Sequence, residues 1–336
     1  MPLDIACLSD IKTAAAVLPK ADQAAINAAR DRQDQLTKPP GSLGTLEDIA
    51  LFIAGWQNSE RPTADYAQAL VFAGNHGICN RGVNPFPQAV TAQMVANFEA
   101  GGAAINQLCQ VNGATLTVIP LELERPTLDF TKGLAMSEEE TVAAISAGAT
   151  AVDTEADILL LGEMGIGNST IAAALACVSF GGTPEDWVGA GTGSDAAGMA
   201  LKAQVIAEGL ALHGTGEPIM ALAHFGGREQ AAICGAVLAA RATRIPVLLD
   251  GFICTAAVAP LAATDAALLD HCLVGHASAE PGHARLTQAM GKTPILDFGM
   301  RLGEGTGAAL ALNIVRSALA CHNGMATFAE AGVADG

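Results

Sequence analysis

Six short apolar runs, separated by segments of helical character, constrain the fold of this chain more than any other feature. The runs span residues 69–73, 116–119, 158–161, 246–249, 269–274 and 294–298. Strands that alternate with helices pair in parallel through right-handed crossovers. Because the runs are continuously apolar, we expect helices to cover both faces of the sheet. The pattern predicts an α/β fold with a doubly wound, mostly parallel, six-stranded, Rossmann-like sheet.

The two ends of the chain differ from this pattern and predict a smaller helical lobe. The first sixty residues are polar and helical in character, and residues 38–44 form a Lys-Pro-Pro-Gly-Ser-Leu-Gly turn. Ser42 or Thr45 is expected to cap the helix that follows the turn. Residues 325–330 are expected to return onto the N-terminal part. We therefore expect a lobe of residues 1–60 and 321–336 beside a large α/β domain of residues 61–320.

The helical segments between the apolar runs are read from their alanine-rich, periodic composition. We expect helices over residues 90–109, 138–148, 169–178, 195–213, 228–242 and 306–320.

The charge balance excludes partners that are recognised through their phosphate backbone. The formal net charge is −17, whereas sequence-independent nucleic-acid binding depends on Lys and Arg. The same charge disfavours an anionic membrane surface, and no apolar stretch is long and uninterrupted enough to span a membrane. Backbone N–H groups can still hold a small phosphate in an acidic protein.

Cysteine usage and the N-terminus predict a cytoplasmic protein. The eight cysteines are scattered, form no CxxC pair, and several lie in apolar runs. Buried, reduced thiols are typical of reducing compartments. Residues 1–5 lack the basic and apolar regions of a signal peptide.

Glycine-rich loops follow five of the six predicted strands. They occupy residues 75–77, 162–170, 250–251, 275–278 and 303–305. Ligands of open parallel sheets bind beyond the carboxyl ends of the strands. We therefore expect these loops to converge on one rim and form the functional site there.

Glu304 is the single carboxylate of the last of these loops, with Gly303 and Gly305 on either side. The flanking glycines allow unusual backbone angles and close approach of a ligand. The helix that follows is expected to offer free N–H groups to an anion. Two interpretations stay open: a base that points into a pocket, or a carboxylate that stabilises the helix dipole.

Two further loops have the form that cradles a phosphate. Residues 165–170 combine Gly165 and Gly167 with Asn168 and Ser169, which could cap a helix. Residues 189–195 lead into a helix that carries Lys202. A lysine at such a position is commonly solvated surface, but its alanine-rich surroundings also make it a candidate anion partner.

Several familiar motifs are absent or incomplete. Residues 290–293 imitate the end of a P-loop, but Leu286 stands where its first glycine is required, and no dinucleotide or nucleophile-elbow motif is present. The pattern of His276, Glu280 and His283 contains possible zinc ligands, although Pro281 and Gly282 break helical spacing, so hydrogen bonding within a loop is the main interpretation. His76 is open as an acid or base or as a structural residue.

Taken together, these residues resemble the nicotinate-nucleotide–dimethylbenzimidazole phosphoribosyltransferase family. The resemblance runs nearly end to end, and Asn75 departs from the aspartate that is common before His-Gly in the family. The strings that carry it are 38–44, 87–91, 162–170, 189–193, 246–251, 275–283, 302–309 and 325–333.

The resemblance implies a reaction of nicotinate mononucleotide with 5,6-dimethylbenzimidazole that gives α-ribazole 5′-phosphate and nicotinate, with inversion and without a metal or another cofactor. It also implies a homodimer. The implied catalytic residues are Glu304 as base, with Glu163 and Lys202 in support. The glycine loops are expected to hold the phosphoribosyl group, through Gly165, Gly167, Asn168, Gly191, Thr192 and Gly193. Base-binding is expected of Gln88, Leu302 and His76.

Two other classes of function remain as alternatives at this stage. A catalytically silent nucleotide-binding or regulatory protein on the same fold is disfavoured by the joint presence of Glu304, Glu163 and Lys202. A nicotinamide-dependent oxidoreductase is disfavoured by the missing dinucleotide motif.

Overall fold

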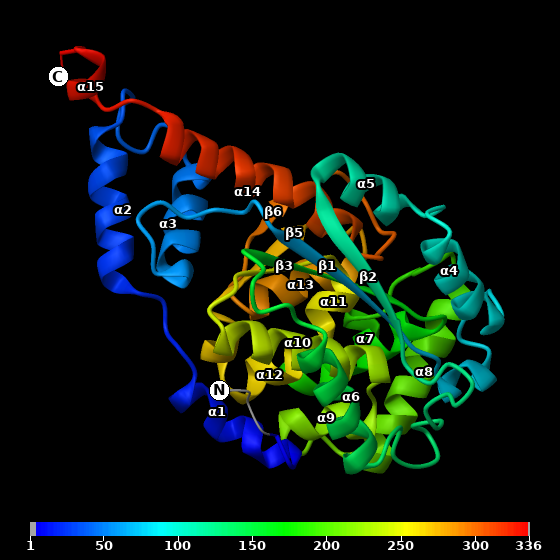
Figure 1. The fold of residues 1–336 in the computed structure, drawn as a ribbon. Coiled ribbons are helices and arrows are strands. Elements are labelled where there is room, and N and C mark those ends of the chain that lie inside the picture. The colour runs from blue at the N-terminus through cyan, green and yellow to red at the C-terminus, as the bar shows by residue number, and fades with distance from the viewer. Residues whose placement is uncertain (1–4, 335–336) are drawn as a thin grey trace.

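A computed structural model, which describes residues 5–334, contains one six-stranded sheet in which all neighbouring strands are parallel (Figure 1). The strand order is β2-β1-β3-β4-β5-β6, so the chain reverses its direction of winding between β1 and β3. The α/β fold and the number of strands predicted from the sequence are confirmed. The strands are β1 (Ala67–Ala73), β2 (Ala114–Pro120), β3 (Ile158–Met164), β4 (Val247–Leu249), β5 (Cys272–His276) and β6 (Pro294–Leu296).

Two details of the predicted strands were wrong. The fifth run was placed at 269–274, but Leu269 ends a short 3-10 helix and β5 continues through His276. The expectation that both faces are covered throughout also fails at the edges, because β2 and β6 consist of half-buried and exposed residues. Edge strands have one neighbour and fewer covering helices, so their apolar sequence does not ensure burial.

The helices cover the sheet on both faces. Side chains of α3, α4, α5 and α14 pack on one face, and those of α6, α7 and α9 to α12 pack on the other. Short 3-10 helices occupy residues 8–10, 77–81, 184–186, 218–220 and 266–269. The α-helices are α1 (Ile11–Val17), α2 (Gln23–Gln35), α3 (Thr45–Gln57), α4 (Ala89–Glu99), α5 (Ala104–Asn112), α6 (Glu138–Thr150), α7 (Asn168–Phe180), α8 (Ala196–His213), α9 (Ala221–His224), α10 (Arg228–Ala242), α11 (Phe252–Ala257), α12 (Ala259–Thr264), α13 (Pro281–Ala289), α14 (Thr306–Gly324) and α15 (Phe328–Ala331).

The single helix predicted over residues 90–109 is in fact two helices, α4 and α5. The helix ends before Gly101, whose φ of 78° lies in the left-handed region, and α5 begins after Gly102. Two successive glycines favour such a break because they tolerate positive φ and stabilise a helix interior poorly.

The predicted cap of α3 was also wrong. Gly44, not Ser42 or Thr45, occupies the N-cap position, with no side-chain cap. Glu47 in the first turn instead accepts the Leu43 N–H at 2.9 Å and pairs with Lys38 at 2.8 Å. The Glu47 carboxylate therefore provides the hydrogen-bond acceptor that we expected from the hydroxyl of Ser42 or Thr45.

Helices α6 and α10 lie side by side with their backbones in close contact (Figure 1). A Cβ atom at Gly148 would overlap the carbonyl of Ala232, and one at Gly235 would overlap the carbonyl of Ile145. The two glycines therefore let the helices approach more closely than any larger residue would permit.

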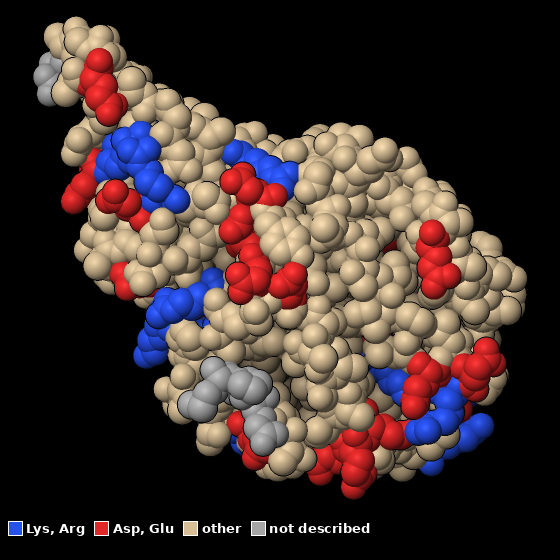
Figure 2. Space-filling model, viewed as in Figure 1, with Lys and Arg blue, Asp and Glu red and all other residues tan. Residues whose placement is uncertain are grey.

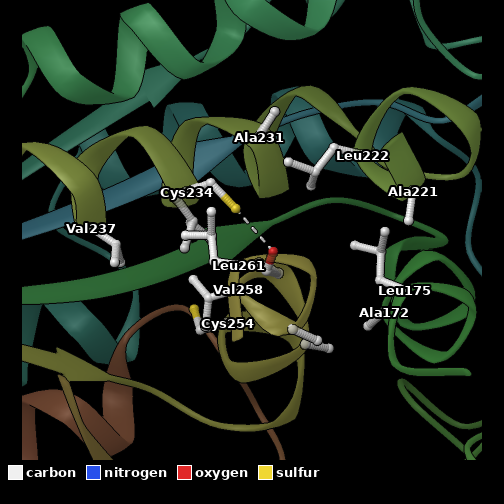
Figure 3. Close-up of a cluster of buried hydrophobic side chains, with 14 of the residues drawn as sticks. Ala172, Leu175, Ala221, Leu222, Ala231, Cys234, Val237, Cys254, Val258 and Leu261 are labelled. Carbon is white, nitrogen blue, oxygen red and sulfur yellow. Dashed lines mark hydrogen bonds between the residues drawn. The ribbon is translucent and has the colours of Figure 1, made fainter. Parts of the chain in front are cut away.

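Small and medium apolar side chains fill the core between α7, α9, α10, α11 and α12 (Figure 3). Ala172, Leu175, Ala231, Val258 and Leu261 are fully buried there. The buried thiol of Cys234 donates to the Ala257 carbonyl at 3.1 Å, as the dashed line shows. Close packing of this kind holds these helices firmly against the sheet that carries the site.

The C-terminal part of α14 and α15 extend away from the sheet beside α2 and α3 (Figure 1). Leu36 forms an isolated antiparallel bridge with Thr327, and Arg32 donates to carbonyls of residues 322, 323 and 325. By contrast, Leu8 and Ile11 pack into the large core on the sheet side. The division into a lobe of residues 1–60 with 321–336 and a domain of residues 61–320 stays a prediction.

Charged side chains are sparse on the face shown in Figure 2, where Lys and Arg lie in small separate groups, most of them beside Asp or Glu. Within residues 5–334, no helix has the length and apolar character to cross a membrane.

Candidate active site

A pocket lies beyond the carboxyl ends of the strands, where the direction of winding reverses. Segments that follow β1, β3, β4 and β5, together with the turn before α14, contribute to it. The reversal point of a doubly wound sheet is where ligands of such folds bind. The predicted convergence on one rim is confirmed for four of the five loops, whereas residues 75–77 do not line the pocket. The lining residues include Asn84, Glu163, Gly165, Gly167, Asn168, Ser169, Gly191, Thr192, Lys202, Gly251, His276, Ser278, Glu280, Arg301, Leu302 and Glu304.

The turn that carries Glu304 has an unusual backbone. Gly303, Glu304 and Gly305 have φ values of 85°, 64° and 86°, all in the left-handed region. A glutamate adopts this conformation only at an energetic cost, so the surrounding structure must hold it. On one side, Gly162 of β3 lies so close that a Cβ atom there would be 2.5 Å from the Gly305 nitrogen.

Asp250, which follows β4, holds the turn from the other side. Its Oδ1 accepts the N–H groups of Gly307 at 2.6 Å and Ala308 at 3.0 Å, and its Oδ2 accepts that of Gly305 at 3.1 Å. We expected these N–H groups at the start of α14 to be free for an anion, and this was wrong. They are already occupied by a buried carboxylate of the protein.

Burial and the nearby Asp250 raise the pKa of Glu304 to about 7. The helix-dipole interpretation would predict a lowered pKa, because a positive helix end stabilises the charged form. Glu304 is 7% exposed and lines the pocket. These observations favour the interpretation of a base that points into a pocket.

Glu163 lies at the end of β3 beside the same turn. Burial raises its pKa to about 8, with further contributions from the charges of Asp250, Glu229 and Glu304, while a hydrogen bond from Asn168 acts in the opposite direction. The predicted capping role of Asn168 was wrong, because Gly167 occupies the N-cap position of α7 and has no side chain. The Asn168 amide instead donates to Glu163 Oε2.

Lys202 is not surface: its side chain is buried and lines the pocket. Its Nζ donates to Ser169 Oγ at 3.1 Å and to the Gly189 carbonyl at 3.2 Å. Within the described chain, no carboxylate lies within 4.0 Å of this ammonium group. Burial lowers its pKa, and the charge of Glu280 opposes this effect. A buried cation with only neutral partners is suited to an anionic ligand.

The loop of residues 189–193 contributes only in part to the pocket. Gly191 and Thr192 line it, whereas Gly193 borders a neighbouring hollow. The Gly191 N–H donates to Glu280 Oε1 at 2.9 Å, and its carbonyl accepts from Arg301 Nη1 at 2.7 Å.

The three residues predicted to bind the base lie in different places. Leu302 lines the pocket and is 55% exposed. Neither Gln88 nor His76 is among the lining residues of this pocket. His76 is fully buried, and its backbone carbonyl accepts a hydrogen bond from the Gln88 amide.

His276, Glu280 and His283 do not form a shared ligand cluster. His283 Nδ1 accepts the Ser278 N–H at 2.8 Å, and its Nε2 lies 3.2 Å from Thr255 Oγ1. Both ring nitrogens of His283 therefore have partners, as the hydrogen-bonding interpretation predicted. Residues 5–334 contain no group of three or more His, Cys, Asp and Glu side chains that could hold a metal ion.

Sequence reasoning missed two residues of the site. Asp250 was noted only as part of a loop, and Arg301 was not singled out. The Asp250-Gly251 pair at a strand end was the available signal for the first. Arg301 precedes Leu302 in the segment that contains Glu304. Because the chain has few basic residues, an arginine so near Glu304 could have been recognised as a candidate site residue.

Comparisons with known proteins agree over nearly the whole chain. A family model described as "Phosphoribosyltransferase" matches residues 18–333. The nicotinate-nucleotide–dimethylbenzimidazole phosphoribosyltransferase of Rhodobacter capsulatus is 63% identical over 331 residues, which cover 98% of this chain and 99% of the relative. The protein of the same name from Novosphingobium aromaticivorans is 57% identical over 333 residues, with 98% of each chain covered.

A solved structure agrees as well. The crystal structure of the enzyme from Thermus thermophilus that carries this name superposes with a TM-score of 0.87 at 39% identity and covers 94% of this chain and 100% of its own. Identity at this level over whole chains shows common family membership and not the fold alone. The chain belongs to the nicotinate-nucleotide–dimethylbenzimidazole phosphoribosyltransferase family.

Proposed function

We propose that this protein transfers the phosphoribosyl group of β-nicotinate mononucleotide to 5,6-dimethylbenzimidazole, with inversion, and releases nicotinate and α-ribazole 5′-phosphate. One observation carries the proposal: a buried ammonium group with no ionic partner among residues 5–334 and a buried carboxylate of raised pKa line the same pocket. The first suits the phosphate of a nucleotide, and the second suits proton removal near neutral pH.

Lys202 would bind the 5′-phosphate, because that phosphate supplies the anion which the buried ammonium group lacks. The N-terminus of α7 at Gly167 and Asn168 adds a partial positive charge on the same side of the pocket. Gly165, Gly191 and the Thr192 hydroxyl would complete the phosphoribosyl subsite. Gly193 would act only through the conformation of its loop, since it borders the adjacent hollow.

Glu304 would act as the general base. One nitrogen of the benzimidazole attacks C1′ of the ribose, and the other nitrogen keeps its proton until the new bond makes the ring cationic. Its N–H then becomes strongly acidic, and the carboxylate removes the proton to leave a neutral product. A base with a pKa of about 7 holds this proton well and is still half ionised near neutral pH.

Glu163 would share a proton with Glu304, and in its ionised form it would support the positive charge that develops on the ribose. Both carboxyls are buried beside Asp250, so their charges disfavour one another. Nicotinate leaves from a pyridinium that is already positively charged, so its departure needs no Lewis acid. Attack on the face opposite to the leaving group inverts C1′, and holding both reactants in line supplies several kcal/mol.

The flat base would lie against Leu302 at the exposed mouth of the pocket. We also propose a homodimer, because Phe86, Phe298 and Leu302 leave large apolar side chains exposed and the charged fraction of the chain is only 15%. A cytoplasmic location is proposed from the eight free thiols.

The test is incubation of the purified protein with nicotinate mononucleotide and 5,6-dimethylbenzimidazole in the presence of a chelator. Equal amounts of nicotinate and α-ribazole phosphate are expected, and the coupling constant of the anomeric proton reports the configuration. Nicotinate release without the benzimidazole would indicate a hydrolase and contradict the proposal.

A further inference from the structure

A second polar cluster lies beneath the pocket and has no role in the reaction as derived above. His76 follows β1, and Glu229 and Gln230 lie in the first turn of α10. All three side chains are fully buried. His76 Nε2 lies 2.7 Å from Glu229 Oε1, and the Gln230 amide donates to the same oxygen at 2.8 Å.

The cluster is incompletely satisfied. His76 Nε2 lies close to Glu229 Oε1, but neither ring nitrogen of His76 nor Glu229 Oε2 has a hydrogen-bond partner in the described structure. Buried polar atoms without partners cost free energy, and they concentrate where function requires them. An apolar pair of similar size would fill the same space at a lower cost.

Glycines surround the pair on three sides and let it approach the pocket. A Cβ atom at Gly165 would lie 2.9 Å from Glu229 Oε1 and 3.0 Å from His76 Nε2. A Cβ atom at Gly74 or Gly227 would also collide with the Glu229 carboxylate. His76 and Glu229 therefore pack directly against the backbone of Gly165, with no side chain between them.

Gly165 connects His76 and Glu229 to the chemistry. It follows Glu163 by two positions in the chain and lines the pocket itself. The Gly74 N–H donates to the Met164 carbonyl at 3.0 Å. This hydrogen bond joins the segment that carries His76 to the segment that carries Gly165. The next residue of the loop, Ile166, is held by a separate hydrogen bond, because its backbone N–H donates to Thr91 Oγ1 at 3.1 Å.

We propose that His76 and Glu229 are positioning residues that fix the position of the backbone of residues 163–168. Through this loop they position the Glu163 carboxylate and the phosphoribosyl group. The kinetic test of this proposal rests on the proposed transferase function, whereas its test by amide hydrogen exchange does not. It replaces the expectation that His76 contacts the base, since His76 acts from beneath the loop.

The charge of Glu229 adds an electrostatic consequence. Glu163 is faced by Asp250 after β4, by Glu304 before α14 and by Glu229 from α10, all of which carry negative charge when ionised, and by the neutral amide of Asn168. Removal of one of these charges makes ionisation of Glu163 easier. A residue that only filled space would not change that ionisation.

Glu229→Gln is the decisive variant, because it keeps the shape of the side chain and removes its charge. We expect the KM for nicotinate mononucleotide to rise about tenfold, since small misplacements of reacting groups are costly. The acid limb of the pH profile of kcat should shift to lower pH. Amide hydrogens of residues 163–170 should exchange faster in the variant without substrate.

His271→Asn provides the matched control. His271 is also fully buried and contacts the Val237 carbonyl at 2.9 Å, but it packs against Trp56 away from the pocket. We expect His76→Asn to change the KM and the loop exchange, and His271→Asn to lower the melting temperature alone.

The proposal is overturned if Glu229→Gln leaves exchange of residues 163–170 at the wild-type rate, or if His271→Asn alters it equally. If wild-type protein shows no transfer at all, the proposed function fails. The exchange measurement, which needs no turnover, then still decides whether the pair positions the loop.

Discussion

Asp250 holds the strained turn that presents Glu304 to the pocket. Its carboxylate accepts three N–H groups at the start of α14, and its charge adds to the burial that raises the pKa of Glu304. One buried side chain therefore holds the turn of the proposed base and contributes to its basicity. The hydrogen bonds to Asp250 help to hold Glu304 at its φ of 64°, in the left-handed region.

Asp250→Asn should separate these effects in part. The amide oxygen can accept fewer of the N–H groups, so we expect a loss of about 1–2 kcal/mol in the free energy of unfolding. Because the negative charge beside Glu304 is removed, the acid limb of the kcat/KM profile should move from near pH 7 to lower pH. Denaturant titration and pH-dependent kinetics measure the two effects.

Asp195→Asn is a suitable control for this prediction. Asp195 caps α8 by accepting the Gly198 N–H at 2.8 Å, but it is exposed. This variant should lose little stability and leave the pH profile in place. An equal shift of the profile in both variants would refute the role of Asp250.

Lys202→Ala should weaken use of the phosphorylated substrate. Loss of a charged hydrogen bond costs about 1.5–3 kcal/mol, or roughly 10- to 150-fold in kcat/KM for nicotinate mononucleotide. Lys132→Ala, at a site with a 74% exposed side chain, should leave kcat/KM unchanged. Unchanged kinetics in Lys202→Ala would show that another group binds the phosphate.

The raised pKa of Glu163 predicts a pH dependence of stability. The folded protein keeps this proton up to a pH of about 8, whereas the unfolded chain releases it near the ordinary glutamate pKa of 4.5. Between these values the folded state binds more protons, so its stability falls as the pH rises. Other groups titrate in this window as well, and the difference between wild type and Glu163→Gln isolates this one.

We expect wild type to lose a few kcal/mol more than Glu163→Gln between pH 5 and pH 9. Urea denaturation at several pH values measures this difference. Parallel stability curves for the two proteins would contradict the raised pKa.

Gly235→Ala tests the close contact of α6 and α10. The added Cβ would overlap the Ile145 carbonyl, and overpacking of this kind costs about 1–3 kcal/mol or more. Gly133→Ala, where nothing lies within 4 Å, should leave the melting temperature nearly unchanged. Equal stability of the two variants would mean that the helices can separate without cost.

The sequence predicted those features that depend on local patterns. Apolar runs near Leu160 and Leu248 identified the strands, and the glycine loops indicated which edge of the sheet carries the site. The rim position of Glu304 and Glu163 was accessible because both lie in glycine loops at strand ends and in matching family strings. Lys202 lies in no such string and was accessible only from its alanine-rich helix after residues 189–193 and from the family resemblance.

Contacts between distant segments could not be predicted in the same way. Asp250, which follows β4, accepts N–H groups at the start of α14, and Glu229 of α10 lies beside His76, which follows β1. No periodicity marks such pairs, since they depend on how loops meet after the sheet has formed. The break at Gly101 was visible in the sequence but was outweighed by the apolar pattern around it.

The most direct measurement is a parallel assay of wild type and Glu304→Gln with nicotinate mononucleotide and 5,6-dimethylbenzimidazole, with both products followed by chromatography. The account predicts equal amounts of nicotinate and α-ribazole phosphate from wild type. In the variant, kcat should fall by about 10²–10⁴ while nicotinate mononucleotide still binds, because a neutral amide cannot accept the proton. Near-wild-type turnover by Glu304→Gln, or an absence of α-ribazole phosphate from wild type, would contradict it.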